Sequence, residues 1–362
     1  MKRLTILIFL ICLAFCSCAH TGAEDTSAPE NENTLTEEVT SEAIAEETTT
    51  EGITAEEITT EEITTRPVDD KIRNPLNGAV INEEYDKRVF AVAVHNTEAA
   101  MPLKGISQAD VFFELLSDGY TTRGLALFSD ISAVKEVGAI AGSRYMFTEL
   151  SAVYNAVLCH AGGTAGVLRD MNDRGVRGIN ADFEAGYRDA SREAKGTDWE
   201  YTLLSKGSEL YKGAEQKGFA LTGATDGFLF CDELSIENGE SAETLEICFT
   251  LEGKTKRTIM NYEKASDRYI FSQYGKVMTD DNNGKPIGFT NVIVLFMTAY
   301  TDGAYHAYDF DGEGEGYFAC GGRSVPVKWS YERGKGPFVL TRENGSPLYL
   351  EQGNTYIALC VK

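Results

Sequence analysis

The stretch between residues 19 and 70 restricts folding more than any other feature of this chain. It is a loose repeat of Thr, Glu, Ala and Ile, whose clearest copies are Glu56-Glu57-Ile58-Thr59-Thr60 and Glu61-Glu62-Ile63-Thr64-Thr65. It has no aromatic residue and holds 16 acidic residues against the single basic Arg66. Such a segment buries too little apolar surface to offset the entropy of ordering, and its like charges repel. We therefore expect residues 18–70 to be a disordered tether and residues 71–362 to hold the fold.

The first residues have the pattern of an export signal. Met1-Lys2-Arg3 is basic and precedes an apolar run from residue 4 to residue 15. The run is shorter than the ~20 residues that span a bilayer, and it ends in small residues and cysteines, as secretory signal peptides do. Ser17-Cys18 resembles a bacterial lipobox. We expect residues 1–17 to be removed and Cys18 to carry acyl chains such as palmitate, which anchor the protein to the outer face of the cytoplasmic membrane. The alternative is ordinary secretion with cleavage nearby.

The net charge argues against a nucleic-acid partner, and the cysteine pattern favours buried thiols. The formal net charge is -23, and most of it lies in the tether. An acidic chain is a poor nucleic-acid binder, so we expect no nucleic-acid partner. Five cysteines follow Cys18, and none of them forms a CxxC pair: Cys159, Cys231, Cys248, Cys320 and Cys360. We expect these cysteines to be small buried hydrophobic residues. The alternative is a disulfide such as Cys231–Cys248.

The folded part changes character along its length, which predicts an α+β or α/β protein. Strands are expected at 89–94, 110–116, 124–129 and 155–159, and helices after Ser143 and at 164–173 and 200–217. From Thr244 onward, short β-rich runs alternate with turn sequences such as Asp281-Asn282-Asn283-Gly284 and Gly321-Gly322. We predict a mixed-sheet region with flanking helices at 71–235 and an antiparallel β-rich region at 236–362.

An ordered set of short motifs is similar to a known family. The set includes Asn96, Gly105-Ile106-Ser107-Gln108-Ala109-Asp110, Phe113-Glu114, Thr122-Arg123 and His160-Ala161-Gly162-Gly163, and later Val327-Lys328-Trp329 and Gly353-Asn354-Thr355. Together they resemble the YerB-like lipoproteins of Gram-positive bacteria, over most of 73–362. The resemblance implies an envelope lipoprotein and no particular reaction. The chain departs from the family pattern by lacking the first Arg of a doubled pair before Arg144, and by carrying Asp198-Trp199-Glu200 where relatives have Pro-His-Asn.

One cluster of residues is a candidate ligand site. His95-Asn96 and His160 to Gly163 each follow an expected strand, and ligands of open α/β sheets bind beyond the carboxyl ends of strands. Gly162 and Gly163 allow close approach of a ligand, and Gly142-Ser143-Arg144 is expected to open a helix whose N–H groups face an anion. Arg123 and Arg144 offer forked donors to phosphate or carboxylate.

The sequence also offers candidate acid–base residues but little support for a metal site. His160, Asp110 and Glu114 are the candidate acid–base residues. The structural alternatives are an Arg123–Glu114 ion pair, a His160 that bonds only backbone, and an Asp110 that caps a turn. Four histidines in the whole chain make a metal site or other cofactor unexpected. Asp309 to Glu315 fits an acidic β-turn better than a calcium loop.

Two functions follow from these residues. The first is a non-catalytic module that binds a cell-wall polymer or an envelope protein at the distance set by its tether. The second is an envelope enzyme for an anionic substrate, with His160 as acid or base and with Arg123 and Arg144 holding the anion. A transporter's substrate-binding lipoprotein is a weaker third reading, because the chain lacks two similar α/β halves.

Overall fold

The computed structural model describes residues 70–362 except 237 and 303–304. The expected signal peptide, Cys18 and the tether lie outside the described residues. Within the described residues, none of the helices combines the length and the apolar character needed to cross a membrane.

A 13-stranded mixed sheet forms the centre of the structure. Its main path runs β10-β22-β21-β18-β25-β2-β3-β1-β5-β6, with β19, β20 and β23 attached at its sides. Its strands are β1 Phe90–His95, β2 Val111–Asp118, β3 Thr121–Phe128, β5 Val157–His160, β6 Gly178–Asn180, β10 Glu240–Ser241, β18 Asn291–Met297, β19 Ala299–Asp302, β20 Tyr305–Tyr308, β21 Gly312–Cys320, β22 Arg323–Tyr331, β23 Val339–Arg342 and β25 Thr355–Val361. β1 is buried along its whole length, because it lies inside the sheet between β3 and β5.

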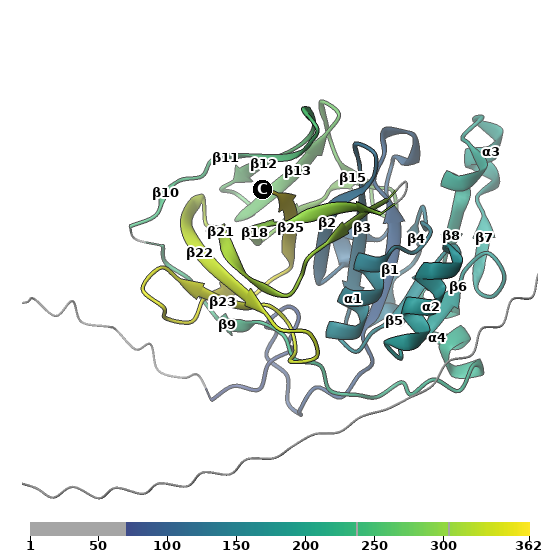
Figure 1. Cartoon of the computed structure of the whole chain (residues 1–362), viewed down its shortest axis with the longest axis horizontal. Helices are drawn as coiled ribbons and strands as arrows, with labels where there is room; N and C mark the ends of the chain where they lie inside the picture. The colour runs from purple at the N-terminus through teal and green to yellow at the C-terminus, as the bar shows by residue number, and fades with distance from the viewer. Residues whose placement is uncertain (1–69, 237, 303–304) are drawn as a thin grey trace, which may run out of the picture. The chain divides into compact units, whose positions relative to one another are not determined.

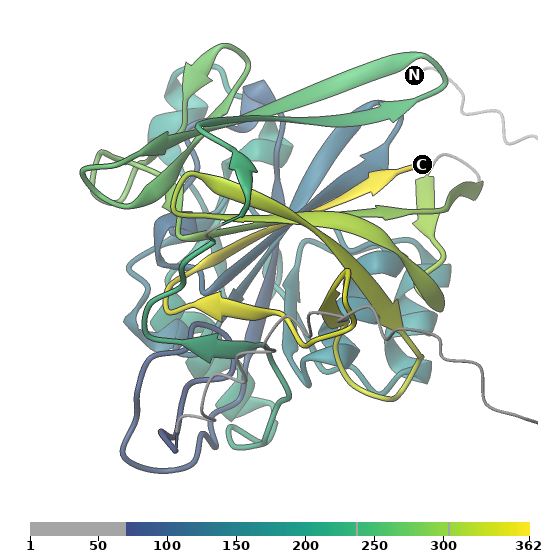
Figure 2. The ribbon, with the colours of Figure 1, turned by 90° about the vertical axis from the view of Figure 1, so that its left-hand side faces the viewer.

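Smaller sheets surround this centre. The largest contains β11 Thr244–Leu251, β12 Lys254–Glu263, β13 Arg268–Gln273, β14 Lys276–Val277 and β17 Gly288–Phe289. The others are β4 Val137–Gly138 with β7 Gly186–Arg188 and β8 Leu203–Ser205, then β9 Leu229–Cys231 with β24 Tyr349–Glu351, and β15 Thr279–Asp280 with β16 Lys285–Pro286. Figure 2 shows the long β11–β12 hairpin as a separate layer beside the central sheet.

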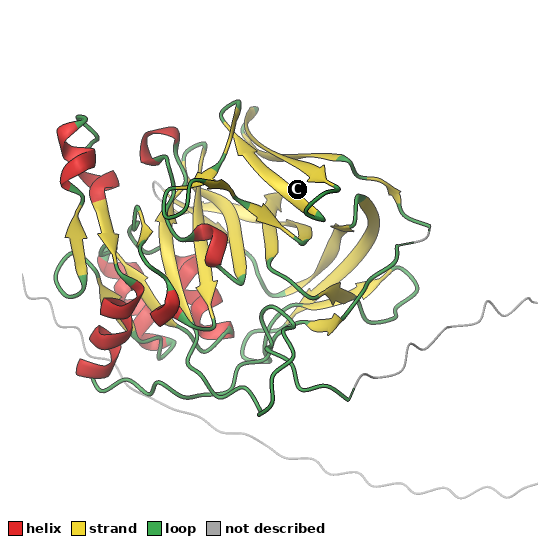
Figure 3. Ribbon diagram, turned by 180° about the vertical axis from the view of Figure 1, so that it is seen from behind, coloured by secondary structure: helices red, strands yellow, loops and turns green. Residues whose placement is uncertain are grey.

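The helices gather at one end of the molecule. They are α1 Tyr145–Val153, α2 Ala165–Asp173, α3 Ala190–Ala194 and α4 Gly207–Gln216, with 3-10 turns at Glu98–Ala100, Ile106–Gln108, Ile131–Ala133 and Trp199–Thr202. Figure 1 shows α1, α2 and α4 beside β1, β5 and β6, and Figure 3 shows the helical end opposite the all-strand end. This is the α+β arrangement that the sequence predicts.

Most predicted elements are present, with two corrections. Residues 200–217 were expected to be one helix, but Leu203–Ser205 is a strand held between β4 and β7, and α4 begins only at Gly207. Ser143 does not cap α1: Arg144 occupies the cap position in an extended conformation, and the Ser143 N–H donates to the Gly162 carbonyl.

The two sequence regions share the central sheet. β25, the last strand, runs parallel to β18 on one side and to β2 on the other, and β24 runs parallel to β9. These two strands depart from the antiparallel pairing predicted for the C-terminal region. Strands from before and after residue 236 thus pair directly. The division at 235/236 stays a prediction from composition.

A buried polar cluster links the central sheet to the β11–β13 layer. The Glu114 carboxylate on β2 is fully buried and accepts hydrogen bonds from Tyr356 at 2.6 Å and Thr258 at 2.9 Å, and it forms an ion pair with Lys256. Asn96, Thr122 and Gln273 donate to the same carboxylate. Because each oxygen has several donors, the buried charge is well satisfied.

Candidate functional site

The strand directions bring several predicted site residues to one edge of the sheet. β1 and β5 are parallel, so His95 and His160 end their strands at the same edge. β3 is antiparallel to β1, and its register places Arg123 directly opposite His95. The loop before α1 joins this edge because Ala141 N–H donates to Ala93 O and Ala161 N–H donates to Ala141 O.

A pocket of about 440 Å³ opens at this edge. Its lining includes five of the predicted residues or their neighbours in the same motifs, namely His95, Arg123, Gly142, Arg144 and Gly163. The rest of the lining is Ala161, Thr164, Asp182, Arg188, Trp199, Glu200 and Tyr305. The volume lies within the range of small-molecule sites.

Asp118 holds the two central arginines together. Arg123 donates from Nε to Asp118 Oδ2 at 2.9 Å, and Arg144 donates from Nε to Oδ1 and from Nη2 to Oδ2, both at 2.9 Å. Burial alone would raise the pKa of Asp118, but the hydrogen bond from Arg144 and the charges of both arginines lower it, so the carboxylate is ionised at neutral pH. One negative charge therefore serves two positive ones, and this trio keeps a surplus positive charge.

The same arginines retain donors for a ligand. Arg123 Nη1 also donates to Gly142 O at 2.9 Å, and Arg144 Nη1 to Ser143 O at 2.8 Å. A guanidinium has five N–H groups. The contacts found among the described residues use about three on each arginine, which leaves donors on two adjacent guanidinium groups that line the pocket.

His95 contributes a neutral imidazole to the pocket. Burial and the charges of Arg123 and Arg144 lower the pKa of His95 to about 3. Its ring meets the Tyr201 ring edge-on, with centroids 4.9 Å apart. A neutral imidazole carries one N–H donor and one acceptor nitrogen, so His95 offers hydrogen bonds to a ligand without adding a charge to the pocket.

His160 lies behind the pocket rather than in its lining. It is buried, and its Nδ1 lies 2.8 Å from Gly162 O, which also accepts the Ser143 N–H. Burial lowers the pKa of His160, and the bond to Gly162 opposes that shift. Gly162 adopts a left-handed backbone with φ 72° that turns its carbonyl toward both groups. His160 thus positions the Gly162-Gly163 turn.

Three other predicted residues lie elsewhere. Asp110 precedes β2 at the end opposite Asp118, where it accepts from Asn77 at 2.6 Å and from the Ser129 N–H. Glu114 and Asn96 belong to the polar cluster with Lys256 described above. Arg123 pairs with Asp118 and not with Glu114.

The Ser143 side chain is fully buried and does not line the pocket. Among the described residues there is no group of three or more His, Cys, Asp or Glu side chains able to hold a metal.

About half of the residues that form the site were not predicted from the sequence. Asp118 carried a usable signal, because Asp118-Gly119 opens the tight turn that returns the chain to Arg123. Arg188 and Trp199 had none, because they belong to a short strand and a 3-10 turn between α2 and α4. The Arg188 guanidinium lies 4.0 Å from the Trp199 ring centroid, donates to Trp199 O at 2.7 Å and pairs with Asp182.

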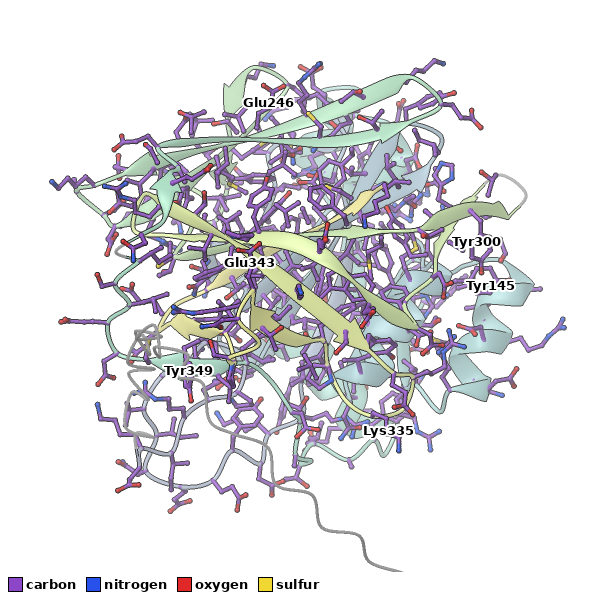
Figure 4. The ribbon with its side chains drawn as sticks, turned by 60° about the vertical axis from the view of Figure 1, so that its left-hand side comes forward. Tyr145, Glu246, Tyr300, Lys335, Glu343 and Tyr349 are labelled. Carbon is purple, nitrogen blue, oxygen red and sulfur yellow. The ribbon has the colours of Figure 1, made fainter. Side chains whose placement is uncertain are left out.

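Tyr305 reaches the pocket from the C-terminal region. It lies on β20, which contacts α1 and pairs at its first residue with Asp118. The Arg144 guanidinium stacks over the Tyr305 ring at 4.2 Å. Figure 4 shows Tyr300 of the β19–β20 hairpin and Tyr145 of α1 on the same flank of the molecule.

Within the described residues, the cysteines contribute to no metal-binding group. Cys159, Cys320 and Cys360 are buried, Cys248 is exposed, and none of the four is in a disulfide. Cys231 is buried and its thiol bonds Leu350 O at 3.5 Å. Because Cys248 is not in a disulfide, the alternative Cys231–Cys248 bond is not formed.

Comparison with known proteins places the chain in a family. Residues 76–220 match the N-terminal domain, and residues 249–357 the C-terminal domain, of a protein family of unknown function called DUF3048. The chain is 26% identical over 297 residues to YerB of Bacillus subtilis (strain 168), which is named as a lipoprotein, and the match covers 79% of this chain and 86% of YerB. The crystal structure of B. subtilis YerB superposes with a TM-score of 0.69 at 24% identity, covering 80% of this chain and 96% of that one. The chain therefore belongs to the DUF3048 family of YerB-like proteins, as its motifs predicted.

Proposed function

We propose that this chain is a lipid-anchored binding module of the cell envelope that holds an anionic ligand between Arg123 and Arg144. The observation that carries the proposal is the pair of guanidinium groups that share Asp118 and line one pocket. Oriented, partly buried arginines bind phosphate and carboxylate groups with forked, charge-assisted hydrogen bonds. Asp118 fixes both side chains before a ligand arrives, which lowers the entropy cost of binding.

A binding role fits the pocket better than catalysis by His160. That imidazole is absent from the lining, and its Nδ1 is engaged by the Gly162 carbonyl. A general acid or base must reach the proton that it transfers. The enzyme alternative with His160, Arg123 and Arg144 therefore has support for its arginines but not for its acid–base residue.

The binding proposal is tested by calorimetric titration of inorganic phosphate into the mature protein at low ionic strength. We expect saturable binding that weakens as salt rises. Arg144→Ala should weaken it more than about tenfold, since a hydrogen bond to a charged group contributes about 1.5–3 kcal/mol. The matched control is Arg342→Ala, an exposed arginine on β23 that does not line the pocket. Equal affinities for the two variants would refute the proposal.

Anchoring is tested separately by labelling cells with a palmitate analogue. The relationship to a protein named as a lipoprotein supports lipidation of this chain, and Ser17-Cys18 gives the site. We expect Cys18→Ala to lose the label and Cys16→Ala to keep it, because the bulky Phe15 precedes Cys16. The reverse result would place the lipid on the other cysteine.

A further inference from the structure

The pocket has an aromatic side that an inorganic anion does not need. Trp199 lines it with 64% of its surface exposed, and Phe183, beside the lining residue Asp182, is 85% exposed. Tyr305, on β20 of the C-terminal region, adds a third aromatic ring to the pocket. Large apolar side chains that stay exposed around a polar pocket commonly mark a ligand or partner surface.

The Trp199 indole is held in one orientation. Arg188 stacks on the ring at 4.0 Å, and the same guanidinium donates to the Trp199 carbonyl and pairs with Asp182. The bonds to the carbonyl and to Asp182 hold the Arg188 guanidinium in place, and its stacking restrains the indole from one face. Since most of the indole remains exposed, the ring offers a preoriented flat surface, and a ligand that stacks on it loses little side-chain entropy.

Acidic and neutral polar groups line the same pocket as the aromatic residues and the arginine pair. The carboxylates of Asp182 and Glu200 line the pocket together with the Thr164 hydroxyl and the neutral His95 ring. Carboxylates accept hydrogen bonds and would repel a bare anion, but they suit hydroxyl groups that donate. A ligand that matches all of these groups carries an anion at one end and a hydroxylated ring with an apolar face at the other.

We propose that the ligand is a sugar bearing a phosphate or carboxylate group, with its ring stacked on Trp199 and its acidic group between Arg123 and Arg144. This proposal rests on the anion-binding function above and adds the chemical class of the ligand. Asp182 and Glu200 accept the sugar hydroxyls. Trp199 is the residue that separates sugar acids from simple anions.

The test compares probes that share an acidic group but differ in the ring. N-acetylglucosamine 1-phosphate, glucuronic acid, inorganic phosphate and neutral N-acetylglucosamine are titrated into the mature protein by calorimetry. Tryptophan fluorescence follows the ring directly, because the chain has two tryptophans and the other, Trp329, is buried. We expect at least one sugar acid to bind about tenfold more tightly than phosphate, and to change the emission of the wild type but not of Trp199→Phe.

Two variants separate the inference from the function on which it rests. Trp199→Ala should bring the affinity for the sugar acid down to that for phosphate, whereas Trp199→Phe should keep most of the preference. Whichever acid binds more tightly identifies the acidic group. If both sugar acids bind no more tightly than phosphate while Arg144→Ala still weakens phosphate, the sugar assignment is overturned and the anion site stands. If no probe binds, both proposals fall.

Discussion

His95 makes the stability of the fold depend on pH by a predictable amount. Its pKa is about 3 in the folded protein and about 6.5 in an unfolded chain, because folding buries the ring next to Arg123 and Arg144. The unfolded chain therefore takes up a proton below pH 6.5 that the folded protein refuses. Stability must fall as the pH is lowered through 6.5, and the loss ends only near the folded pKa.

The size of the effect follows from the two pKa values. Between pH 7 and pH 5 the unfolded state gains about 2 kcal/mol from protonation of this one side chain, while the folded state gains almost nothing. The assay is urea denaturation at both pH values for the wild type and for His95→Asn, which has no titrating ring. We expect the variant to lose about 2 kcal/mol less than the wild type over this interval.

The comparison isolates His95 from other titrating groups. Burial also lowers the pKa of His160, but that residue is present in both proteins and its contribution cancels. Matching losses of unfolding free energy for wild type and variant would show that His95 is protonated in the folded state. The charge distribution assigned to the pocket would then be wrong.

Three other predictions follow from named contacts. Lys256→Met should reduce the free energy of unfolding by about 3–5 kcal/mol in chemical denaturation, because it leaves the Glu114 charge buried without its ion-pair partner. The control Lys276→Met, at an exposed ion pair, should change the free energy of unfolding by less than about 1 kcal/mol. Similar losses in both variants would refute the role of the buried cluster. In the folded protein a maleimide should label exposed Cys248 first. It should label Cys159 and Cys360 only on unfolding, because burial raises the pKa of both thiols. Mass spectrometry of the peptides measures the labelling rates, and equal rates at all three cysteines would contradict the burial pattern. Asp118→Asn should lower the melting temperature, because two guanidinium groups lose their shared counter-charge, and Asp311→Asn, at an exposed pair with Arg333, should change it little.

The strands of the fold could be predicted because their signals are local. The run before His95 is apolar on every residue, which fits a strand buried on both faces, and the Gly321-Gly322 turn joins two paired strands as its sequence indicates. Position 207 shows where local pattern fails. A Cβ there would lie 1.9 Å from the Ile131 carbonyl, so Gly207 permits a close approach that helical periodicity does not reveal.

The candidate site was half predictable for a similar reason. Arg123, Arg144, His95 and Gly163 follow or begin strands and helices whose direction could be inferred, and the general rule for open sheets brings them to one edge. Glu114 was misplaced because its partner Lys256 lies over a hundred residues away in the sequence, on a different sheet.

Trp199 and Tyr305 depend on long-range packing as well. The first lies on a 3-10 turn and the second on a hairpin from the far end of the chain, and only the assembled fold brings both to the arginines.

A crystal structure of the protein soaked in selenate tests directly whether Arg123 and Arg144 hold an anion between them. The anomalous signal of selenium marks each bound anion without assumptions about the ligand. We expect a selenate within hydrogen-bonding distance of both Arg123 and Arg144, and we expect it to be lost in crystals of Arg144→Ala. Selenate bound at surface lysines, with none between the two arginines, would contradict it.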